Sequence, residues 1–300
     1  MNTQIRLGFL CSLGCYLIWG VLPLYFRTVD HIVPLAVLAH RIIWSVPTAL
    51  VFILIASNWS QIRAVLTVRR MLLLSLSALL IGTNWLIYIY AVDQERVMEA
   101  SLGYYINPLA NVVLGGIVFK ERLRRVQWLA FAIAALGVLI MTVAYGNFPW
   151  LALSLGLSFA LYGVIRKLVI VDSRVGFLME TMILLPFAII GLLILTSSNA
   201  PAEMTGAGSI GLLMLAGPIT AVPLILFGVA AKRLQLSTIG MMQYIAPTLQ
   251  FLVAVLIFKE PFGDDDLVAF AAIWTALLIY STDSVMHEQK LRGTQAPTPS

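Results

Sequence analysis

The chain has 300 residues, of which 60% are hydrophobic and only 11% are charged, and its mean hydropathy is +0.95. Soluble domains are about 45–50% apolar and about 25% charged, so this composition excludes a water-soluble protein and predicts an integral membrane protein. The net charge of +5 does not indicate a nucleic-acid partner, because the Lys and Arg residues lie in short gaps between apolar runs.

Ten apolar runs are long enough to cross a bilayer, since about 20 helical residues span about 30 Å of hydrocarbon. They cover residues 7–26, 35–56, 71–92, 100–119, 126–145, 150–166, 176–196, 209–231, 238–258 and 267–284. The sixth is the shortest, because Arg166 and Lys167 end it early. The first is too long for the apolar part of a cleavable signal peptide and should remain as a helix. The polar segment 285–300 should be a disordered cytoplasmic tail.

The distribution of Lys and Arg predicts how these spans are oriented. If the N-terminus is cytoplasmic, fifteen Lys and Arg fall on the cytoplasmic side, three fall on the other side, and Arg41 lies within the second span. The cytoplasmic set is Arg6, Arg63, Arg69, Arg70, Lys120, Arg122, Arg124, Arg125, Arg166, Lys167, Arg174, Lys232, Arg233, Lys290 and Arg292, and the other set is Arg27, Arg96 and Lys259. Both termini are therefore expected in the cytoplasm.

One stretch of the chain occurs twice. Residues 99–121, EASLGYYINPLANVVLGGIVFKE, resemble residues 238–260, TIGMMQYIAPTLQFLVAVLIFKE, with Pro108 and Pro247 at equivalent places 139 residues apart (247 − 108). The halves 7–145 and 150–284 each hold five spans, and because five is odd the second half must be inverted relative to the first. The sequence thus predicts an all-α membrane fold of two inverted five-helix repeats around a central cavity, as in secondary transporters.

Polar and aromatic side chains gather around the two prolines. Each proline lacks an N–H and frees the carbonyl four residues earlier, so both helices should be kinked where they face protein or water. The candidate cavity residues are Trp19, Asn84, Tyr88, Tyr104, Tyr105, Asn107, Asn111, Tyr162, Gln243, Tyr244 and Gln250. An alternative stays open, in which the Asn and Gln side chains only tie helices together.

Two charged residues at equivalent positions lie inside predicted spans. Arg41, next to His40, and Glu180 are 139 residues apart (180 − 41), and a charge at mid-bilayer costs about 2.5–3.5 kcal/mol on insertion scales. Inverted repeats place them more than ~10 Å apart in depth, so separate partners are expected. The candidates are Glu99, Asp93 or Asp30 for Arg41, and Arg166, Lys167 or Lys232 for Glu180. These pairs could act as two gates; snorkelling to the headgroups is the alternative.

With these residues in view, the chain resembles the drug/metabolite transporter superfamily, specifically its EamA-type members and their RarD subgroup. The resembling segments include YLIWGVLPLYF (16–26), HRIIWS (40–45), GTNWLIYIYAV (82–92), EASLGYYINPLANVVLG (99–115) and LSTIGMMQYIAPTL (236–249). The resemblance implies ten helices, two EamA repeats and an inner-membrane carrier that exports metabolites or drugs, and RarD-type members are associated with chloramphenicol sensitivity. The second copy has Ala246 in place of Asn107 and Gln250 in place of Asn111, so a symmetric ligand site is not expected.

The predicted function is alternating-access transport of a small organic or amino-acid-like solute, with no cofactor or metal. The chain has no G-x-x-x-x-G-K-[ST] loop, and both proton coupling through Glu180 or His40 and uncoupled transport stay open. An intramembrane enzyme is one alternative, but H-E-x-x-H and G-x-S-x-G are missing. A non-transporting adaptor or receptor is another, although short loops leave little docking surface. The expected partners are the lipid bilayer and the solute, without nucleic acid; a homodimer stays open.

Overall fold

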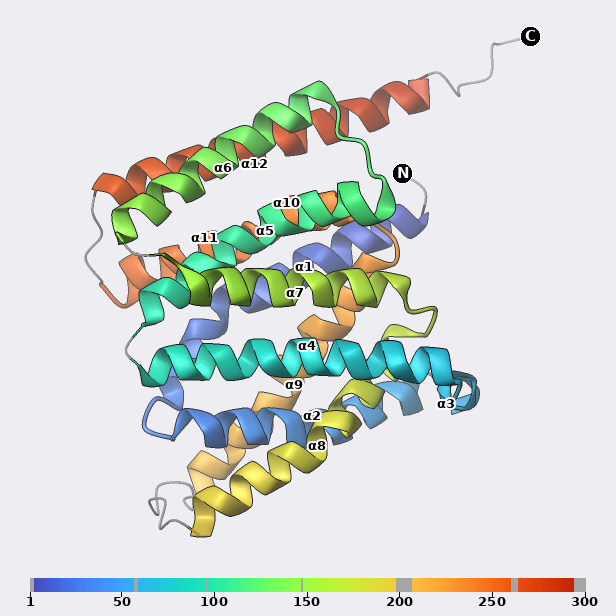
Figure 1. The fold of residues 1–300 in the computed structure, drawn as a ribbon. Coiled ribbons are helices and arrows are strands. Elements are labelled where there is room, and N and C mark those ends of the chain that lie inside the picture. The colour runs from blue at the N-terminus through green and yellow to red at the C-terminus, as the bar shows by residue number, and fades with distance from the viewer. Residues whose placement is uncertain are drawn as a thin grey trace.

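The structure is a computed structural model that describes residues 3–56, 59–94, 96–146, 148–197, 207–259 and 264–293. The regular elements in these ranges are helices (Figure 1). They are α1 Thr3–Thr28, α2 Pro34–Ile55, α3 Trp59–Val65, α4 Val68–Asp93, α5 Val97–Phe119, α6 Arg125–Tyr145, α7 Trp150–Leu168, α8 Ser173–Ser197, α9 Ala207–Ala231, α10 Leu236–Gln243, α11 Ile245–Leu252, the π-helix η2 Val253–Ile257 and α12 Asp264–Gly293.

Most of these helices have the length and composition of membrane spans. Within the described ranges nine segments qualify, with α10, α11 and η2 forming one of them, Leu236–Ile257. The prediction of an all-helical, multi-pass membrane protein is therefore confirmed. The tenth predicted span, 267–284, lies in α12, whose apolar part is shorter, Phe270–Asp283. That helix continues to Gly293, so residues 285–293 are helical where the sequence predicts a disordered tail, and residues 294–300 lie outside the described ranges.

The long helices lie side by side in one bundle (Figure 1). At one edge α6 packs along α12, in the middle α5 packs against both α7 and α10, and at the other edge α2 packs against α8 and α9. Glycines allow close approach in these contacts, because a Cβ atom on Gly217 would lie 2.3 Å from the carbonyl oxygen of Trp44 and one on Gly240 would lie 2.7 Å from that of Pro108. Large apolar side chains cover much of the outside, as expected where lipid replaces water.

The two copies of the repeated segment end in the same way. Lys120, which follows α5, has a φ of 54°, and Lys259, which follows η2 and Phe258, has a φ of 58°. Among non-glycine residues in the described ranges, only these two have positive φ. A left-handed residue after a helix ends it by turning the chain away, so the Phe-Lys sequence stops both copies by the same backbone geometry.

The two copies differ at their prolines. Helix α5 continues through Pro108, whereas the second copy is interrupted at Tyr244 and resumes as α11. Pro247 lies in the first turn of α11, where backbone N–H groups have no helical partner, so the missing donor costs little. Farther along, the N–H of Phe258 donates to the carbonyl of Val253 at 3.0 Å, the five-residue spacing of a π-helix. Only the second copy is therefore broken.

Candidate functional site

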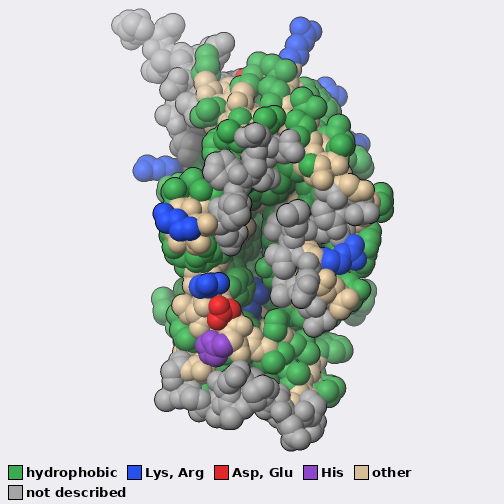
Figure 2. Space-filling view, turned by 90° about the vertical axis from the view of Figure 1, so that its left-hand side faces the viewer, with side chains coloured by type: hydrophobic (Ala, Val, Ile, Leu, Met, Phe, Trp, Pro, Cys, Tyr) green, Lys and Arg blue, Asp and Glu red, His purple; other side chains and the backbone are tan. Residues whose placement is uncertain are grey.

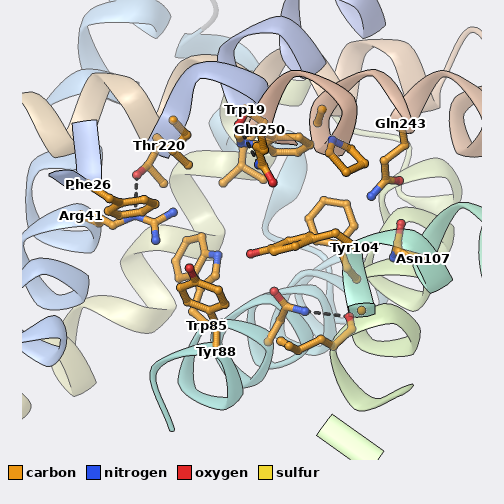
Figure 3. A pocket seen from close by; sticks show the side chains of 18 residues that line it. Trp19, Phe26, Arg41, Trp85, Tyr88, Tyr104, Asn107, Thr220, Gln243 and Gln250 are labelled. Atoms are coloured by element: carbon orange, nitrogen blue, oxygen red, sulfur yellow. Dashed lines mark hydrogen bonds between the residues drawn. The ribbon is translucent and has the colours of Figure 1, made fainter. Parts of the chain in front are cut away.

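A cavity lies inside the bundle, between helices of both halves of the chain. The space inside it that the centre of a water-sized sphere can occupy is about 100 Å³, within about 910 Å³ of empty space that includes the open solvent at its mouth. Figure 2 looks at the end of the bundle where α2, α5, α7 and α9 begin, and a hollow opens near the centre of this face. The cavity is lined by Trp19, Leu22, Phe26, Arg41, Asn84, Trp85, Tyr88, Gly103, Tyr104, Asn107, Leu155, Phe159, Thr220, Leu224, Gln243, Ala246, Pro247 and Gln250 (Figure 3).

Nine residues that sequence reasoning selects are brought together in this lining. They are Trp19, Arg41, Asn84, Tyr88, Tyr104, Asn107, Gln243, Pro247 and Gln250. Several are fixed by hydrogen bonds to the opposite half: Asn84 Nδ2 donates to the carbonyl of Leu155 at 2.9 Å, and Gln250 Nε2 donates to the carbonyl of Trp19 at 2.9 Å. These amides therefore tie helices together and also face the cavity, so the two alternatives left open by the sequence are not exclusive.

An amide cluster joins three helices at one side of the cavity. Asn107 Nδ2 donates to the carbonyl of Gly156 at 2.6 Å, and Asn111 Nδ2 donates both to Asn107 Oδ1 at 3.0 Å and to Gln243 Oε1 at 3.1 Å. Asn111 is fully buried behind the lining and does not belong to it. Its interactions are those of a residue that holds α5 against α10.

Tyrosine 105 points away from the cavity, although its neighbour Tyr104 lines it. Adjacent helical residues are about 100° apart, so the two rings leave α5 in different directions. The ring of Tyr105 packs edge-on against Phe270 of α12 at a centroid distance of 5.5 Å, and the hydroxyl of Tyr244 donates to the Tyr105 carbonyl at 3.2 Å. Neither Tyr105 nor Tyr244 lines the cavity, and the same holds for Pro108.

Arg41 enters the cavity from α2 and has mainly aromatic neighbours. Its Nε donates to Thr220 Oγ1 at 3.0 Å, and its Cζ lies 5.0 Å from the ring centroid of Trp85 and 5.7 Å from that of Phe26. Such contacts stabilise a desolvated cation. Of the carboxylates proposed for it from sequence, Asp30 lies instead 3.9 Å from Arg27 at the end of α1.

Some of the predicted gate residues are placed elsewhere or fall outside the described side chains. The side chains of Asp93 and Glu99 are not among those described. His40 does not line the cavity. Sequence reasoning missed two lining residues that contact Arg41, namely Phe26 and Thr220. Trp85, which also contacts Arg41, adjoins the selected residue Asn84 in sequence. Thr220 has no sequence feature that marks it as a lining residue, because its contact with Arg41 depends on how α9 packs against α2.

Glu180 has its own buried partners. Arg166 Nη1 lies 3.1 Å from Glu180 Oε1, Ser77 Oγ donates to the same oxygen at 2.5 Å, and the hydroxyl of Tyr162 donates to Oε2 at 3.4 Å. Tyr162 is fully buried and stacks on Phe227 instead of lining the cavity. Helix α7 continues past the point where the sequence predicts its end, because Arg166 is neutralised inside the protein and does not reach the headgroups.

Another buried carboxylate, that of Glu121, joins the two halves of the chain at the end of the bundle opposite the hollow. The Glu121 carboxylate accepts hydrogen bonds from the backbone N–H groups of Leu236 (2.8 Å) and Ser237 (3.0 Å) and from Ser237 Oγ (2.8 Å). Lys167 Nζ lies 3.5 Å from it. A carboxylate is favoured at the N-terminus of α10 by the free N–H groups and the helix dipole. We call this set the Glu121 contact; the sequence indicates only that the helix ends there.

Lys232 follows α9 at the same end of the bundle. Burial lowers the pKa of its ammonium group to about 8, and the positive charges of Arg166 and Arg233 add to the effect. Asp172 and Glu180 act in the opposite direction. This lysine therefore titrates closer to neutral pH than an exposed one.

Comparison with known proteins agrees with this architecture. Residues 6–143 match the EamA-like transporter family. The chain is 44% identical to Protein RarD of Escherichia coli K12 over 96% of this chain and 98% of that protein, and 42% identical to an uncharacterized transporter of Vibrio cholerae over 95% of both. It is 32% identical to the chloramphenicol-sensitive protein RarD of Pseudomonas aeruginosa over 95% of this chain and 98% of that protein.

A solved crystal structure of another protein has the same fold. It superimposes with a TM-score of 0.72 at 18% identity and covers 96% of this chain and 99% of its own. The family match and the near full-length relatives in bacteria agree with the membrane-spanning helices of this structure. The chain belongs to the EamA-like transporter family as a RarD-type, multi-pass membrane transporter of the drug/metabolite class.

Proposed function

We propose that this transporter moves a small organic solute by alternating access and that the cavity of Figure 3 is its solute site. The observation that carries the proposal is the lining itself, which comes from both halves of the chain, with Trp19 and Tyr104 from the first and Phe159 and Gln243 from the second. The Glu121 contact joins the same halves at the other end of the bundle. Movement of one half against the other would expose the site to each side in turn.

The proposed architecture is ten spans in two inverted repeats. Two cation–aromatic contacts support it: Lys167 Nζ lies 5.1 Å from the ring centroid of Phe119, and Arg27 Cζ lies 5.6 Å from that of Phe258. The two aromatic residues are 139 positions apart in the sequence (258 − 119), and the two cations are 140 positions apart (167 − 27). In both contacts the aromatic residue directly precedes a lysine with left-handed backbone conformation. Helix α1 begins and α12 ends at the same end of the bundle, as an even number of crossings requires (Figure 1).

We further propose that the protein lies in a bacterial inner membrane with both termini in the cytoplasm and works as an exporter. The orientation rests on the fifteen-to-three distribution of Lys and Arg. It places the hollow of Figure 2 on the outer face, so that the conformation is open to the outside and closed toward the cytoplasm by the Glu121 contact. The drug/metabolite family and the chloramphenicol-sensitive relative in Pseudomonas aeruginosa support a small organic solute.

The test compares the solutes released by cells that produce the protein with those released by cells that produce a blocked variant. Ala246 lines the cavity, so Ala246→Trp should fill it, while Ala246→Ser serves as the matched control. Cells with the wild type and cells with A246S should raise the concentrations of the same solutes in the medium, measured by mass spectrometry. Cells with A246W should not raise them, although the variant is present in the membrane at equal abundance. An unchanged set of released solutes in A246W would contradict the proposed site.

Alternating access is tested separately by locking the Glu121 contact. A disulfide between Glu121→Cys and Ser237→Cys, in a background with Cys11→Ser and Cys15→Ser, would hold the two halves together at that end. Solute release should stop on oxidation and return on reduction. Release that continues in the cross-linked protein would rule out movement at this end as a step of transport.

A further inference from the structure

Within the described part of the chain, the guanidinium group of Arg41 makes one side-chain hydrogen bond and has further donors that face the cavity. Arginine carries five N–H donors, and Nε is occupied by Thr220. In Figure 3 the remaining two nitrogens point from the wall toward the centre of the cavity, on the side of Tyr104 and Trp85. A guanidinium fork of this kind matches the two oxygens of a carboxylate.

No protein carboxylate neutralises Arg41 within the part of the chain that the structure describes. Among the described residues that line the cavity it is also the one charged residue, and none of them is Asp or Glu. Two other buried charges of the described ranges are neutralised by the protein: Arg166 pairs with Glu180, and Glu121 accepts three hydrogen bonds and lies beside Lys167. Arg41 differs from Arg166 and Glu121 in that it faces the proposed solute site.

The walls beyond Arg41 suit an apolar or aromatic body. Trp85 and Phe26 lie beside the guanidinium, and Trp19 and Phe159 form another wall with their ring centroids 5.5 Å apart. Gln243 and Asn107 lie on the side of the cavity opposite Arg41 (Figure 3). The site therefore has one cationic end, aromatic walls and an amide end.

We propose that the solute of this cavity is an organic monocarboxylate with an aromatic or bulky apolar body, its carboxylate bound by Arg41 and its body held between the aromatic walls. This inference rests on the proposed function only in taking the cavity to be the solute site. Binding can be measured without transport, so the two proposals can fail independently.

The test measures binding of phenylacetate, phenylacetamide and phenethylammonium to the purified protein in nanodiscs, by calorimetry and by the change in tryptophan fluorescence. The three probes share one ring and differ in charge. Phenylacetate should bind at least tenfold more tightly than phenylacetamide, and phenethylammonium should bind most weakly. Equal affinities for phenylacetate and phenylacetamide in the wild-type protein would overturn the proposal without any variant.

Variants then assign the preference to Arg41. Arg41→Gln should abolish the preference for phenylacetate over phenylacetamide, and Arg41→Lys should retain part of it because the charge remains without the fork. Arg27→Gln is the matched control, since Arg27 is an exposed cation at the same end of the bundle and should keep the full preference. A preference that survives in R41Q, or disappears in R27Q, would contradict the assignment.

A fourth probe separates carboxylates from other oxyanions. Phenylphosphonate carries a larger charge on a bulkier headgroup, and it should bind more weakly than phenylacetate; tighter binding would overturn the carboxylate assignment. Counterflow of labelled phenylacetate in proteoliposomes distinguishes the two proposals. Charge-selective binding without counterflow would support the carboxylate ligand class and count against its transport. Solute release that A246W blocks, without charge-selective binding, would support transport through the cavity and count against the carboxylate ligand class.

Discussion

Arg166 Nη1 and Glu180 Oε1 lie 3.1 Å apart, with side chains only 1% and 2% exposed, so the seventh and eighth helices share a fully desolvated ion pair. Removing one partner leaves the other charged and buried, which costs about 3–5 kcal/mol. Arg166→Gln should lower the free energy of unfolding by that amount, measured by SDS titration in mixed micelles. The double variant Arg166→Gln with Glu180→Gln should recover part of the loss, because no lone charge remains.

Arg174→Gln is the control for this pair. Arg174 Nε lies 3.6 Å from Asp172 Oδ1, but both side chains are partly exposed, and such pairs contribute about 0–1 kcal/mol. R166Q should therefore cost several times more than R174Q. Equal losses would mean that the buried pair adds nothing beyond an ordinary surface contact.

The Glu121 contact should keep water away from the interior at its end of the bundle. Glu121→Gln removes the charge that favours the N-terminus of α10, and we expect the contact to open more often. Cys15 is fully buried and can report this opening in a Cys11→Ser background. Maleimide labelling of Cys15 should be several-fold faster in E121Q than in the wild type.

Asp172→Asn provides the comparison for that experiment. Asp172 also accepts a hydrogen bond from a helix N-terminus, the N–H of Arg174 at 2.9 Å, but this contact stays within one half of the chain. D172N should label Cys15 at the wild-type rate. If both variants accelerate labelling equally, the cause is a general increase in the mobility of the protein, and not opening of the Glu121 contact between the two halves.

Tyr104 and Tyr105 should differ sharply in their effect on transport. Tyr104 lines the cavity, whereas Tyr105 packs against Phe270 outside it. Tyr104→Ala should reduce solute release at least tenfold at equal membrane abundance, because an aromatic wall is lost. Tyr105→Phe keeps the buried ring and should release solute at nearly the wild-type rate; a loss in this variant would move the site toward α12.

Gly217 should not tolerate a side chain. A Cβ atom there would lie 2.3 Å from the carbonyl oxygen of Trp44, so Gly217→Ala must push α9 away from α2. Overpacking of this kind costs about 1–3 kcal/mol, which a thermal unfolding scan in detergent can detect. Gly191→Ala is the matched control, because no atom lies within 4 Å of its Cβ position, and the added methyl group should leave stability equal or slightly higher.

Lys232 should make stability depend on alkaline pH. Its pKa is about 8 in the folded protein, against an ordinary value of 10.5, so the unfolded chain binds more protons between these two values. The free energy of unfolding should therefore rise as the pH is raised from 8 to 10.5. Lys232→Met should be more stable than the wild type below pH 8 and lose this rise, whereas Lys259→Met, at an exposed position, should keep the wild-type profile.

The sequence predicts the helices well, because long apolar runs leave few alternatives in a membrane. It also selects half of the cavity lining, since Asn84, Asn107 and Gln243 are conspicuous polar residues at depth. The sequence does not show which way each side chain faces in the folded protein. A helix wheel does not show whether Tyr104 or Tyr105 faces inward, because both lie in apolar surroundings and the choice depends on where α7 and α12 pack.

In the sequence, charged residues are interpreted as the ends of membrane spans. This interpretation fails where the folded protein buries a charged residue against a partner. Arg166 has the position of a residue that ends a span, yet it lies buried against Glu180. Glu121 has the position of an exit signal, yet it caps a helix 115 residues away in the chain. Both contacts depend on tertiary neighbours, which no local pattern contains.

The π-helix at Val253–Ile257 links the shape of the second repeated segment to the contact between Phe258 and Arg27. A π-helical turn accommodates one extra residue, so its conversion to an ordinary α-helical turn would rotate everything beyond it by about 100°. Such a rotation would carry the Phe258 ring away from the Arg27 guanidinium and release the end of α1 from this contact. A change of one residue in helical winding would thus couple the register of the second repeated segment to its contact with the end of α1.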